Sequence, residues 1–318
     1  MAVPQRILHN DDLAKIVDTN DEWITQRTGI KTRRIVENGT TVRHLAHRAV
    51  EAALANAGIA PTELDALICA TMTPEMVCPS TAARLVADLG ATPAGAFDVS
   101  AACSGFVYSL NIASAMIQSG HARTVAVVGA ETLSKITDYT DRSTCILFGD
   151  GAGAAVLTAS DDPTQGSIFQ MMYSDGRSWH DIYVPRDRSN LPEHVNGTFS
   201  GNFDKIQMNG REVFKFAVNT LNKAIDEALQ RAGVTADDIA MVVPHQSNIR
   251  ILQAARERLG LPEEKIWINI DRFGNTSAAS VPICLHEIME QGRVKKGDLL
   301  LFIAIGGGLT WATNIWRL

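Results

Sequence analysis

The order of apolar and polar positions predicts helices and buried strands that alternate along most of the chain. Apolar residues recur at helical spacing in Val107–Gly120, whereas Phe97–Val99 and Thr124–Gly129 are short apolar runs typical of strands in a parallel sheet. The segment 160–206 breaks this order, because it is rich in Asp, Ser, Asn and Pro and has only short apolar runs. We expect loops and short strands there, followed by a long helix over Met208–Ala232.

Two stretches of the chain repeat this pattern in one register. The stretch 49–72 aligns with the stretch that begins at Ala224, and each consists of an amphipathic helix, a glycine cap, an acidic turn and a buried strand. The register pairs three positions of the first copy with three of the second: Gly58 with Gly233, Leu64 with Ile239, and Ala70 with His245. The chain therefore contains an internal duplication.

Both copies continue into a second helix and a further strand. We expect the second helices over Ser80–Leu89 and Asn248–Leu259, and the further strands within 96–103 and 266–280. Two similar halves of alternating helices and strands predict an α/β protein in which two units with mainly parallel sheets pack together.

Composition narrows the class of protein. The 318 residues are 46% hydrophobic and 20% charged, and their net charge of -6 gives no indication of nucleic-acid or membrane-surface binding. No apolar run approaches the roughly 18 residues of a membrane span, and the first ten residues lack a signal-peptide pattern. The five cysteines are scattered and lack metal-ligand spacing, so we expect a reduced, cytoplasmic protein without a metal site.

Cys103 lies where a buried strand turns directly into a helix. Its neighbours Ala101, Ala102, Ser104 and Gly105 are small, so another molecule can approach the sulfur. A helix N-terminus favours an anion and can lower a thiol pKa from its usual value of about 8.5. The alternative is a small core cysteine, which is a common role for this residue type.

His245 and Asn275 both follow expected strands of the second half, at the sheet end equivalent to that of Cys103. This arrangement suits acyl transfer followed by carbon-carbon bond formation. A thiolate attacks a thioester, and a neutral histidine and an amide donate hydrogen bonds to the enolate that forms when a malonyl group loses CO2. Gly306–Gly308 lets backbone amides approach an acyl oxygen, although three glycines can also form a tight turn only.

Several motifs carry a specific resemblance over nearly the whole chain. They are DTNDEWITQRTGI (18–30), DVSAACSGF (98–106), FGDGAGAAVL (148–157), PHQSNIRI (244–251), DRFGNTSAASVP (271–282) and GGGLTW (306–311). The chain resembles β-ketoacyl-acyl-carrier-protein synthase III, the initiating condensing enzyme of bacterial type II fatty acid synthesis in the thiolase superfamily. Thiolases have a second cysteine near the C-terminal glycines and elongating synthases a second histidine at position 275, and this chain has neither.

The resemblance implies a duplicated thiolase-like fold of αβαβα layers, with halves at 1–165 and 166–318. Its Cys-His-Asn triad falls on Cys103, His245 and Asn275, and the backbone amides of Cys103 and Gly307 would hold the acyl oxygen. The implied reaction condenses an acyl-CoA primer with malonyl-acyl carrier protein to give 3-oxoacyl-acyl carrier protein, CO2 and CoA, without a permanently bound cofactor.

The resemblance also implies two binding surfaces. The coenzyme A site falls on eight residues: Thr19, Trp23, Arg27, Arg142, Gly210, Phe214, Asn248 and Arg250. Trp23 and Arg142 would enclose the adenine, although Trp23 and Arg27 alone would be an ordinary i,i+4 surface pair. Carrier-protein docking falls on Lys215, Arg250 and Arg256, for which ordinary solvated charges are the alternative.

Two departures from the family pattern affect these expectations. Family members have a short strand before the segment that begins here at Val3, and this sequence does not. We therefore expect either that the sheet lacks this strand or that the true start codon lies further upstream. We also expect a form extended at the N-terminus to be more stable than the shorter form. Cys78 replaces a phenylalanine that closes the partner's acyl pocket in acetyl-primed members, so we expect primers longer than acetyl in a homodimer.

Two other functions remain open from the sequence. One is a related 3-oxoacyl synthase of secondary metabolism that uses CoA thioesters or joins two acyl chains. The other is a redox-sensing or acyl-binding protein in which Cys103 reacts without turnover.

Overall fold

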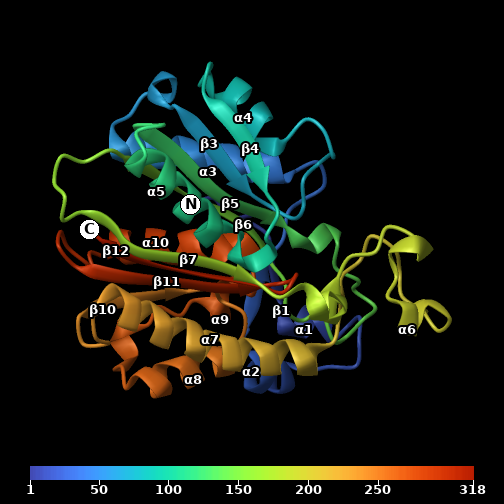
Figure 1. Ribbon diagram of the computed structural model, residues 1–318. Helices are drawn as coiled ribbons and strands as arrows, with labels where there is room; N and C mark the ends of the chain where they lie inside the picture. The colour runs from blue at the N-terminus through green and yellow to red at the C-terminus, as the bar shows by residue number, and fades with distance from the viewer.

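The computed structural model, which describes residues 1–318, contains two four-stranded sheets that face each other across a layer of helices (Figure 1). The strand order in the first sheet is β4-β3-β5-β6. Its strands are β3 (Ala66–Ala70), β4 (Gly95–Val99), β5 (Thr124–Thr132) and β6 (Asp150–Thr158). The central strand β3 runs parallel to β4 and β5, and only β6 is antiparallel to its neighbour.

The second sheet has the order β10-β11-β12-β7. Its strands are β7 (Gly166–Ser174), β10 (Ile239–Pro244), β11 (Leu299–Gly306) and β12 (Thr310–Arg317). The pair β10 and β11 is parallel, whereas β12 and β7 are antiparallel to their neighbours. Both sheets therefore place the carboxyl ends of their parallel strands at one edge, where the helices of the central layer begin.

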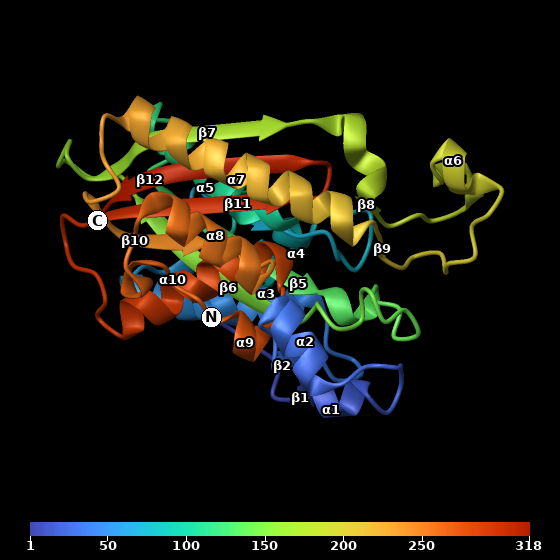
Figure 2. The ribbon, with the colours of Figure 1, turned by 90° about the horizontal axis from the view of Figure 1, so that it is seen from below.

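Six longer helices complete five layers (Figures 1 and 2). Between the sheets lie α5 (Gly105–Gln118) and α10 (Ser280–Glu290), whose apolar residues share one core of 19 buried side chains with both sheets. Outside the first sheet lie α3 (Val42–Ala57) and α4 (Thr81–Leu89), and outside the second lie α7 (Gly210–Ala232) and α8 (Ile249–Leu259). The predicted αβαβα layering is confirmed.

The internal duplication holds at the level of strand register. Ala66 pairs with Val125 in the first sheet, and Met241 pairs with Leu300 in the second, so each residue of the second pair lies 175 positions after its counterpart. The pairs between the parallel strands β3 and β5 therefore correspond to those between β10 and β11, as the aligned sequences predict.

Two local expectations are wrong. The segment 160–206 contains a nine-residue strand, β7, because it completes the second sheet by pairing with β12 along its whole length. The second copy of the further strand shrinks to a single bridge between Ile266 and Val242, since the chain then turns into the short helix α9 (Ile270–Phe273).

The remaining α-helices and strands lie around these layers. They are β1 (Ile7–His9), α1 (Asn10–Leu13), α2 (Asp21–Thr28), β2 (Thr32–Arg34), β8 (Ile182–Tyr183), α6 (Glu193–Asn196) and β9 (Gln207–Met208). The arm that carries α6 extends away from the body of the molecule (Figure 2). Ala2 forms one antiparallel bridge with Ala152 of β6 at the outer side of the first sheet. None of the helices combines the length and the apolar character that a membrane crossing requires.

Candidate active site

Cys103 lies in a single 3-10 turn, Ala102–Ser104, that joins the end of β4 to the start of α5. Ala102 adopts a left-handed backbone angle of φ 45°, which turns the chain sharply so that Cys103 precedes the helix. The expected position beside a helix N-terminus is therefore observed. The cysteine is 7% exposed, so a substrate reaches it only through a cavity.

The backbone of His245 is placed by a neighbouring strand of the second half, and the backbone of Asn275 by a segment of the first half. The His245 backbone N–H directly after β10 donates to Ile303 O of β11 at 2.8 Å. The Asn275 N–H donates to Leu147 O at 2.9 Å, and Gly149 N donates to Asn275 O at 3.0 Å. Asn275 is thus held by a segment of the first half.

Glycines let these two segments approach each other. A Cβ on Gly149 would lie 2.3 Å from Phe273 O, and one on Gly274, whose φ is +66°, would lie 2.8 Å from Leu147 O. Any larger residue would separate the two segments that hold Asn275 in place, which explains the glycines in the two matching motifs.

Cys103, His245, Asn275 and Gly307 line one cavity, although they come from different loops of the two halves. Sixteen of the 23 residues that line it are hydrophobic, among them Phe214. A few polar groups therefore face a mostly apolar cavity, as is typical of sites for small molecules with long apolar parts.

The hydrogen bonds of the two donors orient them. Asn275 Oδ1 accepts from the backbone N–H of Ser277 at 2.9 Å, which leaves the Nδ2 amide hydrogens for the cavity. His245 Nδ1 lies 2.7 Å from Ser280 Oγ. Burial lowers the pKa of His245 to about 3, so its ring is neutral at physiological pH and one nitrogen carries the only ring proton.

The prediction of a lowered Cys103 pKa is wrong. Burial raises the pKa of the thiol to about 12, and the nearby Glu131 carboxylate adds to this rise, while a hydrogen bond from Ser277 opposes it. Desolvation is therefore the dominant influence on the pKa of Cys103. Cys103 rests as a thiol and must lose its proton as it attacks a carbonyl.

A second cavity also reaches Cys103. It is lined by Met72, Leu133, Phe148 and Ile206 on its apolar side, and Phe148 and Gly307 belong to both cavities. Behind it lies the fully buried Glu131, which accepts hydrogen bonds from Thr73 Oγ1 at 2.7 Å and Thr71 Oγ1 at 3.3 Å. The cysteine thus stands where two chambers meet.

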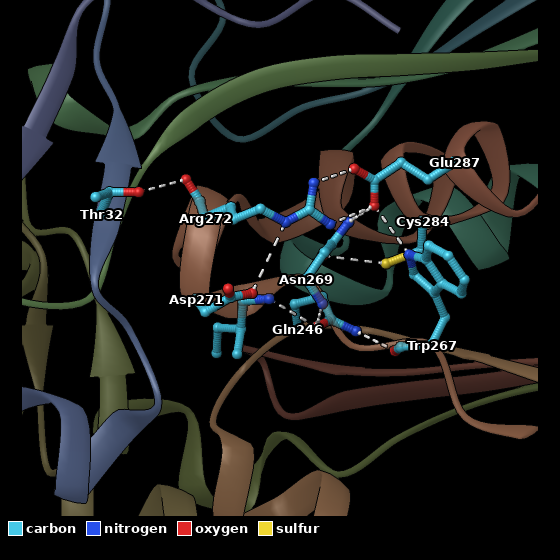
Figure 3. Close-up of polar contacts among 9 residues, drawn as sticks. Thr32, Gln246, Trp267, Asn269, Asp271, Arg272, Cys284 and Glu287 are labelled. Atoms are coloured by element: carbon cyan, nitrogen blue, oxygen red, sulfur yellow. Dashed lines mark hydrogen bonds and ion pairs between the residues drawn. The ribbon is translucent and has the colours of Figure 1, made fainter. Parts of the chain in front are cut away.

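A buried polar network lies behind the His245 and Asn275 loops (Figure 3). Gln246 Oε1 accepts from the backbone N–H groups of Asn269 and Ile270 at 3.0 and 3.2 Å, and its Nε2 donates to Trp267 O at 3.0 Å. The Glu287 carboxylate accepts from Asn269 Nδ2 at 2.8 Å and Trp267 Nε1 at 2.9 Å.

Arg272 completes this network. Its guanidinium donates to both oxygens of Glu287 at 2.6 and 2.9 Å, and its carbonyl accepts from Thr32 Oγ1 at 2.9 Å (Figure 3). Because Arg272 lies on α9, three residues before Asn275, the network ties the two donor loops to α10.

The residues expected to hold the CoA nucleotide lie together beside α2. The Arg142 guanidinium carbon is 4.7 Å from the centroid of the Trp23 ring, and that of Arg27 is 5.4 Å away. Arg142 also lies 3.4 Å from Asp18. Thr19 Oγ1 is buried there without a hydrogen-bond partner. Since Arg142 covers the Trp23 face in this structure, an adenine between them requires Arg142 to move.

Three of the expected CoA residues line the cavity with Cys103: Gly210, Phe214 and Asn248. Asn248 Nδ2 donates to Arg27 O at 3.0 Å, which connects the lining of this cavity to α2, the helix that carries Trp23. Arg250 places its guanidinium carbon 5.6 Å from the Phe214 ring centroid.

The remaining predicted residues lie outside this cavity. Lys215 is exposed on α7 beside Glu212, and Arg256 on α8 is 3.4 Å from Glu263. Cys78 is exposed and lines neither cavity of its own chain, although its neighbours Met76 and Val77 line the second one.

Four residues near the site carried no assigned role in the sequence analysis: Glu131, Gln246, Ser277 and Ser280. Gln246, Ser277 and Ser280 lie inside matching motifs, but only the folded chain shows their contacts. The duplication offered one signal for Ser280. It aligns with Gly105, 175 positions earlier, so a polar residue replaces a small one there, just as His245 replaces Ala70.

Comparisons with known proteins identify the family of this chain. Residues 97–176 match the family model of 3-oxoacyl-[acyl-carrier-protein (ACP)] synthase III, and residues 229–318 match the model of its C-terminal part. A relative named β-ketoacyl-[acyl-carrier-protein] synthase III from Caldanaerobacter subterraneus subsp. tengcongensis is 49% identical over 98% of this chain and 94% of its own.

Solved structures show that the similarity extends to the whole fold. The crystal structure of 3-oxoacyl-[acyl-carrier-protein] synthase III from Aquifex aeolicus has a TM-score of 0.92 and 46% identity over 100% of this chain and 97% of its own. The synthase III from Thermus thermophilus has a TM-score of 0.93 and 44% identity over 99% and 96% of the two chains. The predictions of a thiolase-like fold and of a condensing acyltransferase are confirmed, and the chain belongs to the β-ketoacyl-[acyl-carrier-protein] synthase III family.

Proposed function

We propose that this enzyme condenses an acyl-CoA primer with malonyl-acyl carrier protein, with Cys103 as nucleophile and His245 and Asn275 as hydrogen-bond donors. The observation that carries the proposal is the cavity that these three side chains share, because they come from opposite halves of the duplication. The first half, 1–165, supplies the sulfur, and the second, 166–318, supplies both donors.

In the first half-reaction Cys103 Sγ attacks the carbonyl carbon of the acyl-CoA. A bond forms between Sγ and that carbon, the bond from the carbon to the CoA sulfur breaks, and the thiol proton leaves with CoA as CoA-SH. The backbone N–H groups of Cys103 and Gly307 stabilise the tetrahedral oxyanion. A resting thiol suits this order, because it loses its proton only when an electrophile is present.

In the second half-reaction the malonyl thioester loses CO2 and becomes an enolate. His245 and the Asn275 amide donate hydrogen bonds to the enolate oxygen, so the negative charge needs no metal partner. The enolate carbon attacks the acyl group on Cys103, and the sulfur leaves as a thiolate that takes one proton from solvent. No permanently bound cofactor enters these steps, and acyl-CoA is a substrate.

The carrier protein and CoA share the approach to the cavity. We propose that Trp23, Arg142, Arg27 and Thr19 hold the CoA nucleotide, while its pantetheine arm passes Gly210, Phe214 and Asn248. Lys215, Arg250 and Arg256 lie on α7 and α8, two helices that pack together, and would meet an acidic carrier protein.

We propose a homodimer formed at the first sheet. Strand β4 has a neighbour on only one side, and it presents Phe97 at 38% exposure. Val77 and Met76 on the loop that carries Cys78 are 80% and 42% exposed. Unpaired edge strands usually carry charge or a cover, so exposed apolar residues favour pairing with a second copy.

Cys78 would then reach the partner's acyl cavity, and its small side chain favours primers longer than acetyl. Rates with acetyl-, hexanoyl- and longer acyl-CoA measure this directly, and a strict preference for acetyl-CoA would exclude it. The five free cysteines support a reducing, cytoplasmic location.

The function is tested by two measurements on the same protein. Intact-mass analysis with a panel of acyl-CoAs should show one acyl group on Cys103, which Cys103→Ser abolishes. CO2 release from malonyl-acyl carrier protein should fall about 100-fold or more in His245→Ala and Asn275→Ala, which should still be acylated. CO2 release from malonyl-CoA at the same rate as from malonyl-acyl carrier protein would favour a synthase that uses CoA thioesters as extender.

A further inference from the structure

The His245 nitrogen that points into the protein lies against one buried hydroxyl. Ser280 Oγ is 2.7 Å from His245 Nδ1, and Ser280 is only 2% exposed and lines neither of the two cavities at Cys103. Nε2 is therefore the ring nitrogen left for the cavity. In a neutral imidazole, the hydrogen bond made by one nitrogen decides which nitrogen carries the proton.

The Ser280 hydroxyl has one proton and two acceptors within reach. One acceptor is His245 Nδ1, and the other is Ser277 O at 2.9 Å. Ser277 O already accepts from the backbone N–H of Ser280. Ser280 Oγ also receives the Gln246 N–H at 3.3 Å. When Nδ1 carries no hydrogen, Ser280 Oγ is the only donor among its hydrogen bonds, whereas Ser277 O keeps the Ser280 N–H as a donor when the hydroxyl turns toward Nδ1.

The internal duplication shows that this contact is specific to the half that carries the histidine. The positions equivalent to His245 and Ser280 in the first half are Ala70 and Gly105, each 175 residues earlier. They pack in the same way, since a Cβ on Gly105 would lie 3.1 Å from Ala70 Cβ. The first half brings an alanine and a glycine into close contact here, whereas the second half fills the same contact with a polar pair.

We propose that Ser280 is a positioning residue that donates its proton to His245 Nδ1 and so keeps the ring proton on Nε2. This inference rests on the proposed function, in which Nε2–H and the Asn275 Nδ2–H donate to the enolate oxygen. The other tautomer would turn a lone pair of Nε2 toward that oxygen and remove one of the two donors.

The tautomer is measured by nitrogen NMR on the whole protein labelled with ¹⁵N-histidine. The signals of His245 are identified as those that disappear from the spectrum of His245→Ala. We expect Nε2 to carry a directly bonded hydrogen and Nδ1 to carry none. A hydrogen on Nδ1 in the wild-type protein would overturn the proposal. This spectrum needs no substituted Ser280, so it decides the question even where the variant folds poorly.

The kinetic test uses Ser280→Ala. We expect CO2 release from malonyl-acyl carrier protein to fall about tenfold or more, while acylation of Cys103 by acyl-CoA stays within about twofold. Ser109→Ala is the matched control, because it removes another fully buried hydroxyl that has no hydrogen-bond partner. Unchanged CO2 release, or an equal loss in both half-reactions, would contradict the proposal.

The outcomes separate this inference from the function on which it rests. If the wild-type protein carries hydrogen on Nε2 but condenses no thioester, the role of Ser280 in setting the tautomer stands and the proposed reaction is wrong. If it condenses thioesters but carries hydrogen on Nδ1, the proposed reaction stands and the role of Ser280 is wrong.

Discussion

Gly306 faces Cys103 so closely that a Cβ on the glycine would lie 2.8 Å from the backbone nitrogen of the cysteine. The same Cβ would lie 2.9 Å from Ala101 O and from Ser104 N. The end of β11 therefore packs directly on the turn that presents the nucleophile, and it is a second-half strand that sets the position of a first-half sulfur.

We predict that Gly306→Ala displaces this turn. All three close atoms belong to backbone, so they cannot rotate away, and crowding of this kind typically lowers the free energy of unfolding by about 1–3 kcal/mol. Acylation of Cys103 should slow about tenfold or more, because the reacting atoms lose their alignment. Intact-mass time courses and chemical denaturation measure the two effects. Gly197→Ala, whose Cβ would meet open space, should change neither.

Arg142→Ala should weaken acyl-CoA binding with little change in turnover. A guanidinium stacked on an aromatic surface is typically worth about 1–2 kcal/mol, so KM for acyl-CoA should rise about tenfold. The matched control is Arg231→Ala, which removes a similar contact 5.1 Å from the Phe169 ring centroid. An acyl-pantetheine thioester lacks the nucleotide, and its KM should be equal in wild type and Arg142→Ala. A rise in both KM values would place Arg142 elsewhere in the mechanism.

Phe97→Asp should dissociate the proposed dimer. The carboxylate would put a charge on the exposed edge of β4, where pairing with a second copy requires apolar contact. Light scattering after size exclusion should give about twice the 34.4 kDa of one chain for the wild type and one chain for the variant. Ile168→Asp alters an equally exposed apolar residue on β7, the edge strand of the second sheet, and should leave the mass unchanged. A monomeric wild type would refute the interface.

Glu131 should make stability fall as pH rises. Burial raises the pKa of this carboxyl to about 7, above the ordinary 4.5 that the unfolded chain has. Between these values the folded protein keeps a proton that the unfolded chain releases, so the free energy of unfolding decreases with rising pH across that window. The total loss is about 3 kcal/mol, and Glu131→Gln should remove it.

Denaturation curves at pH 5 and pH 8 measure this slope in wild type and Glu131→Gln. Glu51→Gln, which changes an exposed carboxyl on α3, is the control. A slope that persists in Glu131→Gln would mean that another buried group, such as Asp150, whose pKa burial also raises, dominates the pH dependence.

Much of the architecture followed from local patterns. Glycine caps ended α3 at Gly58 and α7 at Gly233, and the aligned copies predicted the equivalent strands in both sheets. The nine-residue strand β7 was not predicted, because the apolar runs of segment 160–206 are short and Gly166–Ser174 becomes a strand by pairing with β12.

The features of the active site likewise fall into those visible in the sequence and those that depend on the folded structure. The duplicated order of elements, the small residues around Cys103 and the polar departures at His245 and Asn275 were all visible in the linear chain, because strand ends and helix starts are local features. Three matters depended on distance in space: the raised pKa of Cys103, the contact of Ser280 with His245, and the approach of Gly306 to the nucleophile turn. Desolvation and hydrogen bonding between residues far apart in sequence exist only after the two halves have packed together, and no local pattern encodes them.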